Sequence, residues 1–318
     1  MLTYTNPVYG EYMADPFVLR HEETYYAYGT APHDIRGRTF RVLTSTNLVD
    51  WREVGGALQS IGAPSCWAPE VAYHDGQFYM YYSAGGVDGT GHALRVAMSQ
   101  RPEGPFIDTG ALLLAPEQPF SIDAHPFRDQ DGEWYMFYAV DFLERSSEYH
   151  VGTGIVVDRM ISMTQLEGNP RVVIRPSQDW HLFLPQRTMY GKVYDWYTIE
   201  GPAVLQHDGR YYCFFSGGAW ERQNYGVSYV VADHPLGPYG LPATSSAIFT
   251  TVPGSVIGPG HNSFTRSPDG SEAFIVYHAW DPAMTARLMR IDRLSWHDGV
   301  PQIDGPTWTP QPRPRGGT

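Results

Sequence analysis

Apolar stretches of strand length alternate with polar turns along the chain, and one arrangement of them recurs five times. In each copy an acidic residue or a histidine precedes a short apolar strand, a polar turn and an aromatic-rich strand. The first copy begins at Asp15, turns at residues 21–23 and continues as Tyr25-Tyr26-Ala27-Tyr28. Each copy therefore predicts a β-hairpin. The residues that head the copies are Asp15, Glu70, Asp123, Glu200 and His261.

A third apolar element follows in every copy, about 25 to 32 residues after the head residue. These elements are Arg41–Thr44, Arg95–Met98, Gly154–Val157, Tyr229–Ala232 and Leu288–Ile291. Successive heads are about 61 residues apart on average, so five units of three or four strands fill the chain. Repeated all-β units that carry Gly and aromatic residues are typical of a propeller. The sequence predicts an all-β fold, a five-bladed β-propeller that forms a single domain over residues 1–318.

The composition agrees with a closed ring and limits the partners. Hydrophobic residues make up 42% of the chain, and the 33 Gly and 26 Pro are spread among the turns. The net charge of −12, with no run of five or more Lys and Arg, argues against nucleic acid or an anionic membrane as partner. No stretch of 18 or more apolar residues is present to span a membrane. A neutral oligosaccharide is compatible with such a surface.

Two features indicate the compartment. Residues 1–7 lack the layout of a signal peptide. Cys66 and Cys213 lie far apart and show no metal or redox spacing, which favours buried thiols in a reducing compartment over a disulfide. The sequence therefore predicts a cytoplasmic protein.

The head residues are the candidates for chemistry, because equivalent positions of the inner strands converge at one mouth of a propeller. A lone acid there is more often a strand-end group that caps a turn, and Glu70 is interpreted in this architectural way. Turn capping does not explain several acids at equivalent positions, because clustered like charges are costly unless they take part in chemistry or are paired with partners. Glycosidic bond hydrolysis uses such a set: a protonated acid, an ionised carboxylate, and a third carboxylate that raises the acid's pKa.

Five short motifs, one in each repeat, resemble those of glycoside hydrolase family 43, five-bladed propeller enzymes that act on arabinose- and xylose-containing polymers. The motifs are Ala14-Asp15-Pro16, Trp67-Ala68-Pro69-Glu70, Ile122-Asp123, Glu200-Gly201-Pro202 and Gly260-His261-Asn262-Ser263. The resemblance covers essentially the full length. It implies that Asp15 is the general base, Glu200 the general acid and Asp123 the carboxylate that orients and tunes the acid. It also implies inversion of configuration, with acid and base roughly 6.5–9.5 Å apart.

The resemblance extends to substrate contacts, for which Trp67, His125, His261 and Arg287 are predicted. Arg287 is equally well explained as a strand-face arginine that pairs with an acid. His125 departs from the pattern of many relatives, which have Pro soon after the Asp, and it either touches sugar or fills the channel wall. In some members the residue matching His261 helps to hold a metal ion or water, so a structural Ca²⁺ at the axis is a hypothesis. No cofactor is expected to be required.

The interval from Asp123 to Glu200 is the longest, about 77 residues against 53 to 61 elsewhere. Long loops on a rigid scaffold often shape a site. We expect this insertion to wall the mouth into a pocket and to favour exo attack, although a surface excursion or a dimer contact explains it nearly as well. Its polar and aromatic residues include Tyr149, His150, Asp179, Trp180 and His181.

The leading functional hypothesis is an inverting, exo-acting α-L-arabinofuranosidase that acts on arabinan or arabinoxylan oligosaccharides. It depends on Gly258–Ser263 and Tyr277–Trp280, which look more like the arabinose-acting members than the xylosidases. A β-D-xylosidase and an endo-arabinanase are the alternatives within the family. A non-catalytic carbohydrate-binding propeller is the alternative from another class, and the presence of all three carboxylates argues against it.

Overall fold

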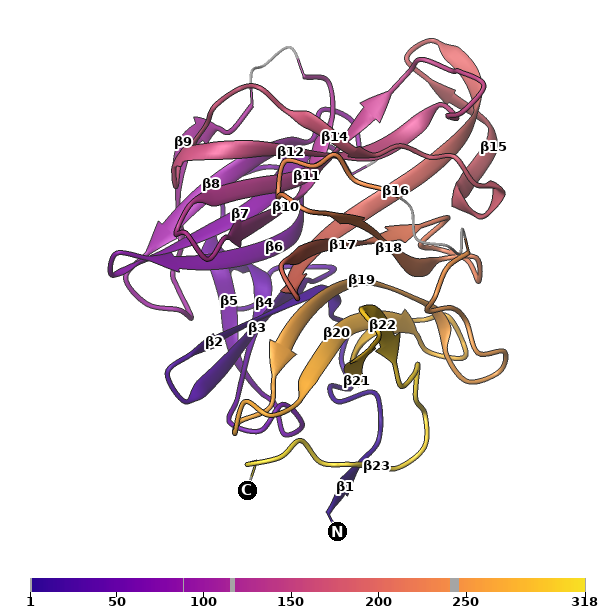
Figure 1. The fold of residues 1–318 in the computed structure, drawn as a ribbon. Coiled ribbons are helices and arrows are strands. Elements are labelled where there is room, and N and C mark those ends of the chain that lie inside the picture. The colour runs from indigo at the N-terminus through magenta and orange to yellow at the C-terminus, as the bar shows by residue number, and fades with distance from the viewer. Residues whose placement is uncertain (1, 88, 115–117, 241–245, 318) are drawn as a thin grey trace.

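Each predicted repeat forms a set of antiparallel strands that pair in chain order, and the five sets follow one another around a common axis (Figure 1). The computed structural model describes residues 2–87, 89–114, 118–240 and 246–317. Three blades are separate four-stranded sheets. Blade 1 contains β2 (Ala14–His21), β3 (Thr24–Thr30), β4 (Arg38–Ser45) and β5 (Arg52–Gln59). Blade 2 contains β6 (Ser65–His74), β7 (Gln77–Gly85), β8 (Ala93–Ser99) and β9 (Ile107–Leu112). Blade 5 contains β19 (Ile257–Arg266), β20 (Ala273–Trp280), β21 (Arg287–His297) and β22 (Val300–Ile303).

Blades 3 and 4 are joined into one nine-stranded sheet. The joint is a short parallel pairing of β12 with the early part of β16, at Gly152–Tyr197 and Thr153–Thr198. Blade 3 contains β10 (Ser121–Arg128), β11 (Trp134–Phe142), β12 (Gly152–Ser162), β13 (Gln165–Leu166) and β14 (Arg171–Ile174). A 3₁₀ turn (Asp179–His181) and β15 (Leu182–Met189) then lead to blade 4, with β16 (Lys192–His207), β17 (Arg210–Gly217) and β18 (Gly226–Ala232).

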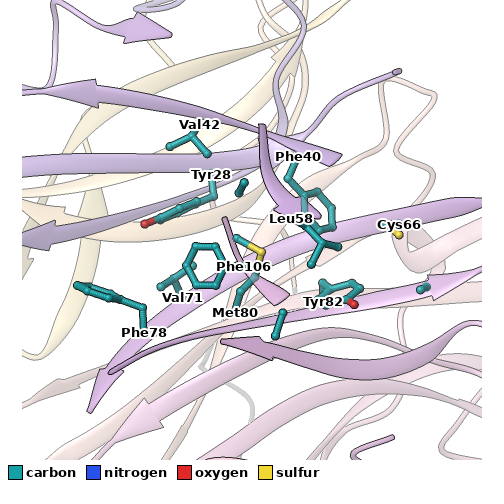
Figure 2. Close-up of a cluster of buried hydrophobic side chains, with 13 residues drawn as sticks. Tyr28, Phe40, Val42, Leu58, Cys66, Val71, Phe78, Met80, Tyr82 and Phe106 are labelled. Carbon is teal, nitrogen blue, oxygen red and sulfur yellow. The ribbon is translucent and has the colours of Figure 1, made fainter. Parts of the chain in front are cut away.

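The hydrophobic core lies between the blades, as five clusters that each join one pair of neighbours. Figure 2 shows the cluster between blades 1 and 2, where Tyr28 and Val42 meet Val71 and Met80. The two-residue period of a strand explains the arrangement, because alternate side chains of β11 face opposite neighbours. Met136 and Tyr138 pack toward blade 2, while Tyr135 and Phe137 pack toward blade 4. These interfaces and the sheet order confirm the predicted five-bladed β-propeller.

The N-terminal segment closes the ring. The backbone N–H groups of Val8 and Met13 donate to the carbonyls of Met289 and Arg287, so the segment runs along β21 before it enters blade 1. The side chain of Asn6 adds two bonds with the backbone of Ile291, one to its carbonyl and one from its N–H. β1 (Thr3–Tyr4) also pairs with β23 (Gln311–Pro312), so the two ends of the chain are neighbours (Figure 1). Blades 1 and 5 are thus joined by backbone hydrogen bonds as well as by packing.

Two smaller expectations can be compared with the fold. Cys66 and Cys213 are both buried free thiols, as the favoured reading of their spacing predicts. No helix in the described ranges has the length and apolarity needed to cross a membrane.

Candidate active site

A β-bulge interrupts the inner strand of every blade at the same place. The pairing with the second strand shifts there in all five blades. The first bulged residue has a positive φ of 47° to 60° in each case. Bulges of this kind re-aim side chains and are frequent next to active sites. The five bulged residues are Asp15, Ala68, Asp123, Gly201 and His261.

This geometry corrects the equivalence expected from the sequence. Asp15, Asp123 and His261 do occupy the same position in their blades. Glu200 instead stands one residue before the bulged Gly201, where blade 2 has Trp67. Glu70 stands two residues after the bulged Ala68, which places it deeper along the inner strand. The prediction that Glu70 shares the position of Asp15 was therefore wrong, although the residue is buried close to the axis.

Asp15 lies on β2 among cations and hydrogen-bond donors. Thr30 Oγ1 donates to its Oδ2 at 2.7 Å, and Arg287 Nη1 and His261 Nδ1 each lie 3.4 Å from its Oδ1. Burial by itself would raise the pKa of Asp15, but the charges of His261 and Arg287 and the Thr30 hydrogen bond together lower it well below its usual range. Asp15 is therefore ionised.

His278 also lies beside Asp15 but contributes no charge. The backbone N–H of Asp15 donates to His278 Nδ1 at 3.0 Å, which requires that nitrogen to be an acceptor. Burial, helped by the nearby Arg287 charge, holds the pKa of His278 well below its usual value. The 3.4 Å approach of this nitrogen to Asp15 Oδ1 is consequently not an ion pair.

Glu200 and Asp123 form the acidic side of the site. Tyr225 donates its hydroxyl to Glu200 Oε1 at 2.8 Å, and Asp123 Oδ2 accepts the backbone N–H of Gly201 at 2.9 Å. Burial raises the pKa of Glu200, and the negative charge of Asp123 raises it further, to about 7. Burial likewise raises the pKa of Asp123. Asp15 and Glu200 are thus held in opposite protonation states below about pH 7.

His261 lies among these acids, which favour its positively charged form. Burial alone would lower its pKa, but the carboxylates of Asp15, Asp123 and Glu200 outweigh burial and raise it. Its ring lies over Gly201, where a Cβ would come within 3.2 Å of the imidazole and the φ is +58°. A side chain directly after Glu200 would therefore press on the imidazole, and the glycine there leaves room for it.

These groups open into one cavity of about 820 Å³, within the usual range for a small-molecule site of about 300–1,000 Å³. Six of the predicted site residues line it: Asp15, Trp67, Asp123, Glu200, His261 and Arg287. His125 does not belong to the lining. Its ring lies beside Glu70 and the backbone of β16, with both nitrogens engaged.

Arg287 and Trp67 both line the wall of the cavity. Nε and Nη2 of Arg287 donate hydrogen bonds to Tyr12 Oη at 3.0 and 2.8 Å. The guanidinium also lies 4.3 Å from the centroid of the Trp220 ring. Trp67 stacks on His92 with a ring separation of 3.6 Å. An aromatic face beside charged donors is a suitable surface for a sugar ring and its hydroxyls.

The insertion also contributes to the wall, through residues other than those the sequence suggested. The hairpin of β15 and β16 brings Phe183, Arg187 and Tyr190 to the cavity. Tyr190 donates its hydroxyl to Asp141 of blade 3 at 2.7 Å, which fastens the tip of the hairpin across the mouth. Residues 149, 150 and 179–181 are absent from the lining, and Trp180 and His181 instead cover Gly217 of β17.

A metal at His261 is not supported by a ligand set. Among residues 2–87, 89–114, 118–240 and 246–317, no group of three or more His, Cys, Asp or Glu side chains is arranged to hold an ion. The Ca²⁺ hypothesis stays a prediction.

Several site residues escaped sequence reasoning, among them Tyr12, Thr30, Tyr225 and His278. They come from second strands and connecting segments, so the repeat of head residues along the sequence does not point to them. Tyr225 packs its ring against Gly260, in the motif before His261, where a Cβ would lie 2.2 Å from the ring. That glycine makes room for the tyrosine that holds Glu200.

A sugar-sized cavity that holds an ionised carboxylate, a carboxyl of raised pKa and a third acid is the arrangement that a glycoside hydrolase uses. Comparison with known sequences supports this class and narrows it. The profile of glycosyl hydrolases family 43 matches residues 4–301, and the chain belongs to this family.

The similar proteins are named for different substrates. A crystal structure described as a thermostable family-43 glycoside hydrolase is 40% identical, with a TM-score of 0.85, and the match covers 98% of this chain and 99% of that one. A β-D-galactofuranosidase of Aspergillus niger is 29% identical over 92% of this chain and 82% of its own length. An extracellular exo-α-(1→5)-L-arabinofuranosidase of Streptomyces avermitilis is 28% identical over 96% of this chain and 64% of its own length. The name of the last gives no support to a cytoplasmic location.

Proposed function

We propose that the protein is an inverting, exo-acting α-L-arabinofuranosidase that removes terminal residues from arabinan or arabinoxylan oligosaccharides. The observation that carries the mechanism is the opposite displacement of two carboxyl pKa values in one cavity, lowered for Asp15 and raised for Glu200. Pairs of titratable groups driven apart in this way mark the acid and the base of a site.

In this mechanism Asp15 takes a proton from a water molecule, and the water oxygen forms a bond to the anomeric carbon. The bond from that carbon to the glycosidic oxygen breaks on the opposite face, and Glu200 gives its proton to the departing oxygen. The sugar leaves with inverted configuration. Asp123 keeps Glu200 protonated before reaction through its negative charge, and Arg287 and His261 fix the carboxylate of Asp15.

The hairpin of β15 and β16 supports exo action. Arg187 lies over the rings of Phe183 and Trp196, at 4.9 and 5.6 Å from their centroids, so its side chain is held against the hairpin. With Tyr190 bonded to Asp141, this wall bounds the cavity on the side of blades 3 and 4. A long polymer crossing the mouth would have to pass this wall, whereas a chain end would not.

A second furanoside is a real competitor as substrate. The Aspergillus niger relative is named a β-D-galactofuranosidase, and β-D-galactofuranose has the ring configuration of α-L-arabinofuranose with one added hydroxymethyl group. β-D-Xylosidase and endo-arabinanase activities remain the alternatives within the family, and a binding propeller without turnover is the alternative outside it.

The proposal is tested by the hydrolysis of three 4-nitrophenyl glycosides: the α-L-arabinofuranoside, the β-D-galactofuranoside and the β-D-xylopyranoside. Preferred turnover of the arabinofuranoside, with the β-anomer as first product by NMR, is the expected result. Preference for another glycoside would change the substrate and keep the mechanism. Retention of configuration would refute Asp15 as base, and no turnover of any glycoside or oligosaccharide would favour the binding propeller.

Exo action predicts that linear arabino-oligosaccharides release only arabinose at early times. Product chromatography of a reducing-end-labelled arabinohexaose should therefore show the series shortened by one residue at a time. A dye-linked insoluble arabinan should release little colour. Early appearance of internal fragments, or colour release in proportion to reducing ends, would contradict the proposed role of the hairpin.

The Asp123→Asn variant should shift the upper limb of the pH–rate profile to lower pH. The charge of Asp123 helps to raise the pKa of Glu200, so its removal lets Glu200 lose its proton at lower pH, and the acid acts only while protonated. Asparagine keeps an oxygen for the Gly201 N–H. The check is kcat/KM between about pH 4 and 9, which reports groups of the free enzyme. An upper limb that does not move would remove Asp123 from the tuning role.

A further inference from the structure

Glu70 and His125 form a buried pair that the mechanism above does not use. His125 Nδ1 lies 2.8 Å from Glu70 Oε2, and the two residues are 9% and 7% exposed. They occupy the same position in neighbouring blades, the first paired residue after the bulge. Neither lines the substrate cavity. An ionisable pair buried this close to the site needs an explanation beyond packing.

The other nitrogen of His125 reaches the strand that carries the candidate acid. The backbone N–H of Val204 donates to His125 Nε2 at 3.0 Å. The backbone N–H of Gly201 donates to Asp123 Oδ2 at 2.9 Å. Two side chains of β10 therefore bind the backbone at the first bulged residue, Gly201, and just beyond the bulge, at Val204.

The carboxylate of Glu70 fixes the tautomer that this bond requires. Nε2 accepts from a backbone donor, so it carries no hydrogen, and Nδ1 must carry it. The Nδ1–H is directed at Oε2 of Glu70, which accepts it. Without Glu70, the imidazole is free to place its hydrogen on Nε2, where it would face the Val204 N–H donor to donor.

We propose that the Glu70–His125 pair is a positioning device for Glu200: Glu70 orients His125, and His125 holds the β16 bulge so that the acid points at the glycosidic oxygen. The inference rests on the proposed role of Glu200 as general acid. It makes Glu70 and His125 positioning residues, since neither touches the cavity.

A similar contact on the other side of the ring supplies a matched control. Ser263 occupies the corresponding position of blade 5, and its hydroxyl donates to the carbonyl of Pro16 at 2.8 Å. Ser263 thus holds the bulge that carries Asp15, just as His125 holds the bulge after Glu200. A change at Ser263 should affect the base and not the acid.

The experiment compares two aryl glycosides of the sugar that the enzyme hydrolyses, with phenol or 2,4-dinitrophenol as leaving group. Phenol must be protonated as it departs, whereas 2,4-dinitrophenolate leaves without help, so only phenyl glycoside turnover requires a well-placed acid. General disruption of the fold would lower both rates together. The ratio of the two kcat/KM values therefore reports the placement of Glu200.

The main variant is Glu70→Leu with His125→Phe, because replacing both partners by apolar groups avoids leaving a buried charge unpaired. Its kcat/KM should fall about 10- to 100-fold for the phenyl glycoside and less than about 3-fold for the dinitrophenyl glycoside. His125→Gln should stay within about 3-fold of wild type on both, since its amide can donate to Glu70 and accept from Val204. Ser263→Ala should leave the ratio of the two rates unchanged.

Equal losses on both glycosides, no loss at all, or a His125→Gln variant as impaired as the double variant would each overturn the proposal. Thermal unfolding of all three variants shows which are folded. If the double variant does not fold, the comparison of Glu70→Gln with Glu70→Leu decides, since only glutamine keeps an acceptor for His125. Glu200→Gln is measured beside them. A ratio unchanged in Glu200→Gln would refute the acid itself, whereas a changed ratio there and not in the double variant would refute only the positioning role.

Discussion

The Asp15→Asn variant should lose between about 10²- and 10⁴-fold in kcat, on good and poor leaving groups alike. Asparagine has nearly the size of aspartate and keeps an oxygen for the Thr30 hydroxyl, but its amide cannot take a proton from water. Attack by water is needed whatever group departs, so the leaving group should not alter the loss. The measurement is kcat for phenyl and 2,4-dinitrophenyl glycosides.

The same variant should also lose the lower limb of the pH–rate profile. Asp15 must be ionised to act, and its lowered pKa keeps it so down to acidic pH. Thermal unfolding serves as the control, because the charges of Arg287 and His261 lose their counter-ion in the variant. A folded Asp15→Asn protein with activity within a few-fold of wild type would remove Asp15 from the role of base.

The Glu200→Gln variant should lose between about 10²- and 10⁴-fold in kcat/KM on the phenyl glycoside and far less on the dinitrophenyl glycoside. Glutamine can still accept the Tyr225 hydroxyl, so the loss reports the missing proton and not a displaced side chain. In the wild type the rate should fall as the pH rises through about 7, where Glu200 loses its proton. In the variant this decline should disappear.

Two outcomes would contradict this assignment. A loss of equal size on both glycosides would point to a binding or structural role for Glu200. An upper limb that persists unchanged in Glu200→Gln would show that another group supplies the proton, and Tyr225, which is bonded to Glu200, would be the next residue to replace.

The strands and their order could be predicted from the sequence because the period of two, the turns and the repeat agree along nearly the whole chain. The relative places of Glu70 and Glu200 could not. A bulge adds a residue to one strand, and counting from motif to motif does not reveal on which side of the bulge a residue stands. Blade-to-blade equivalence was therefore one or two residues in error for these two acids.

Site residues on the inner strands could be predicted from the sequence. Site residues that approach the cavity from second strands or loops could not. Asp15, Asp123 and His261 share a repeat position, but Thr30, Tyr225 and His278 belong to second strands or loops. The insertion was expected to wall the cavity, and it does so with Phe183, Arg187 and Tyr190. Trp180 was suggested by its residue type but instead packs over Gly217 of β17. Residue type alone does not distinguish an aromatic ring that is buried from one that faces substrate.

The seam between the first and last blades has a consequence for biosynthesis. Met13 donates to the carbonyl of Arg287, and the Arg287 guanidinium lies beside Asp15, so both the seam and the candidate base depend on residues more than 270 positions apart. A nascent chain can stack its first four blades as they emerge, but Asp15 has no counter-ion until the fifth blade docks. We therefore expect a chain truncated before Arg287 to be inactive even with Asp15, Asp123 and Glu200 all present.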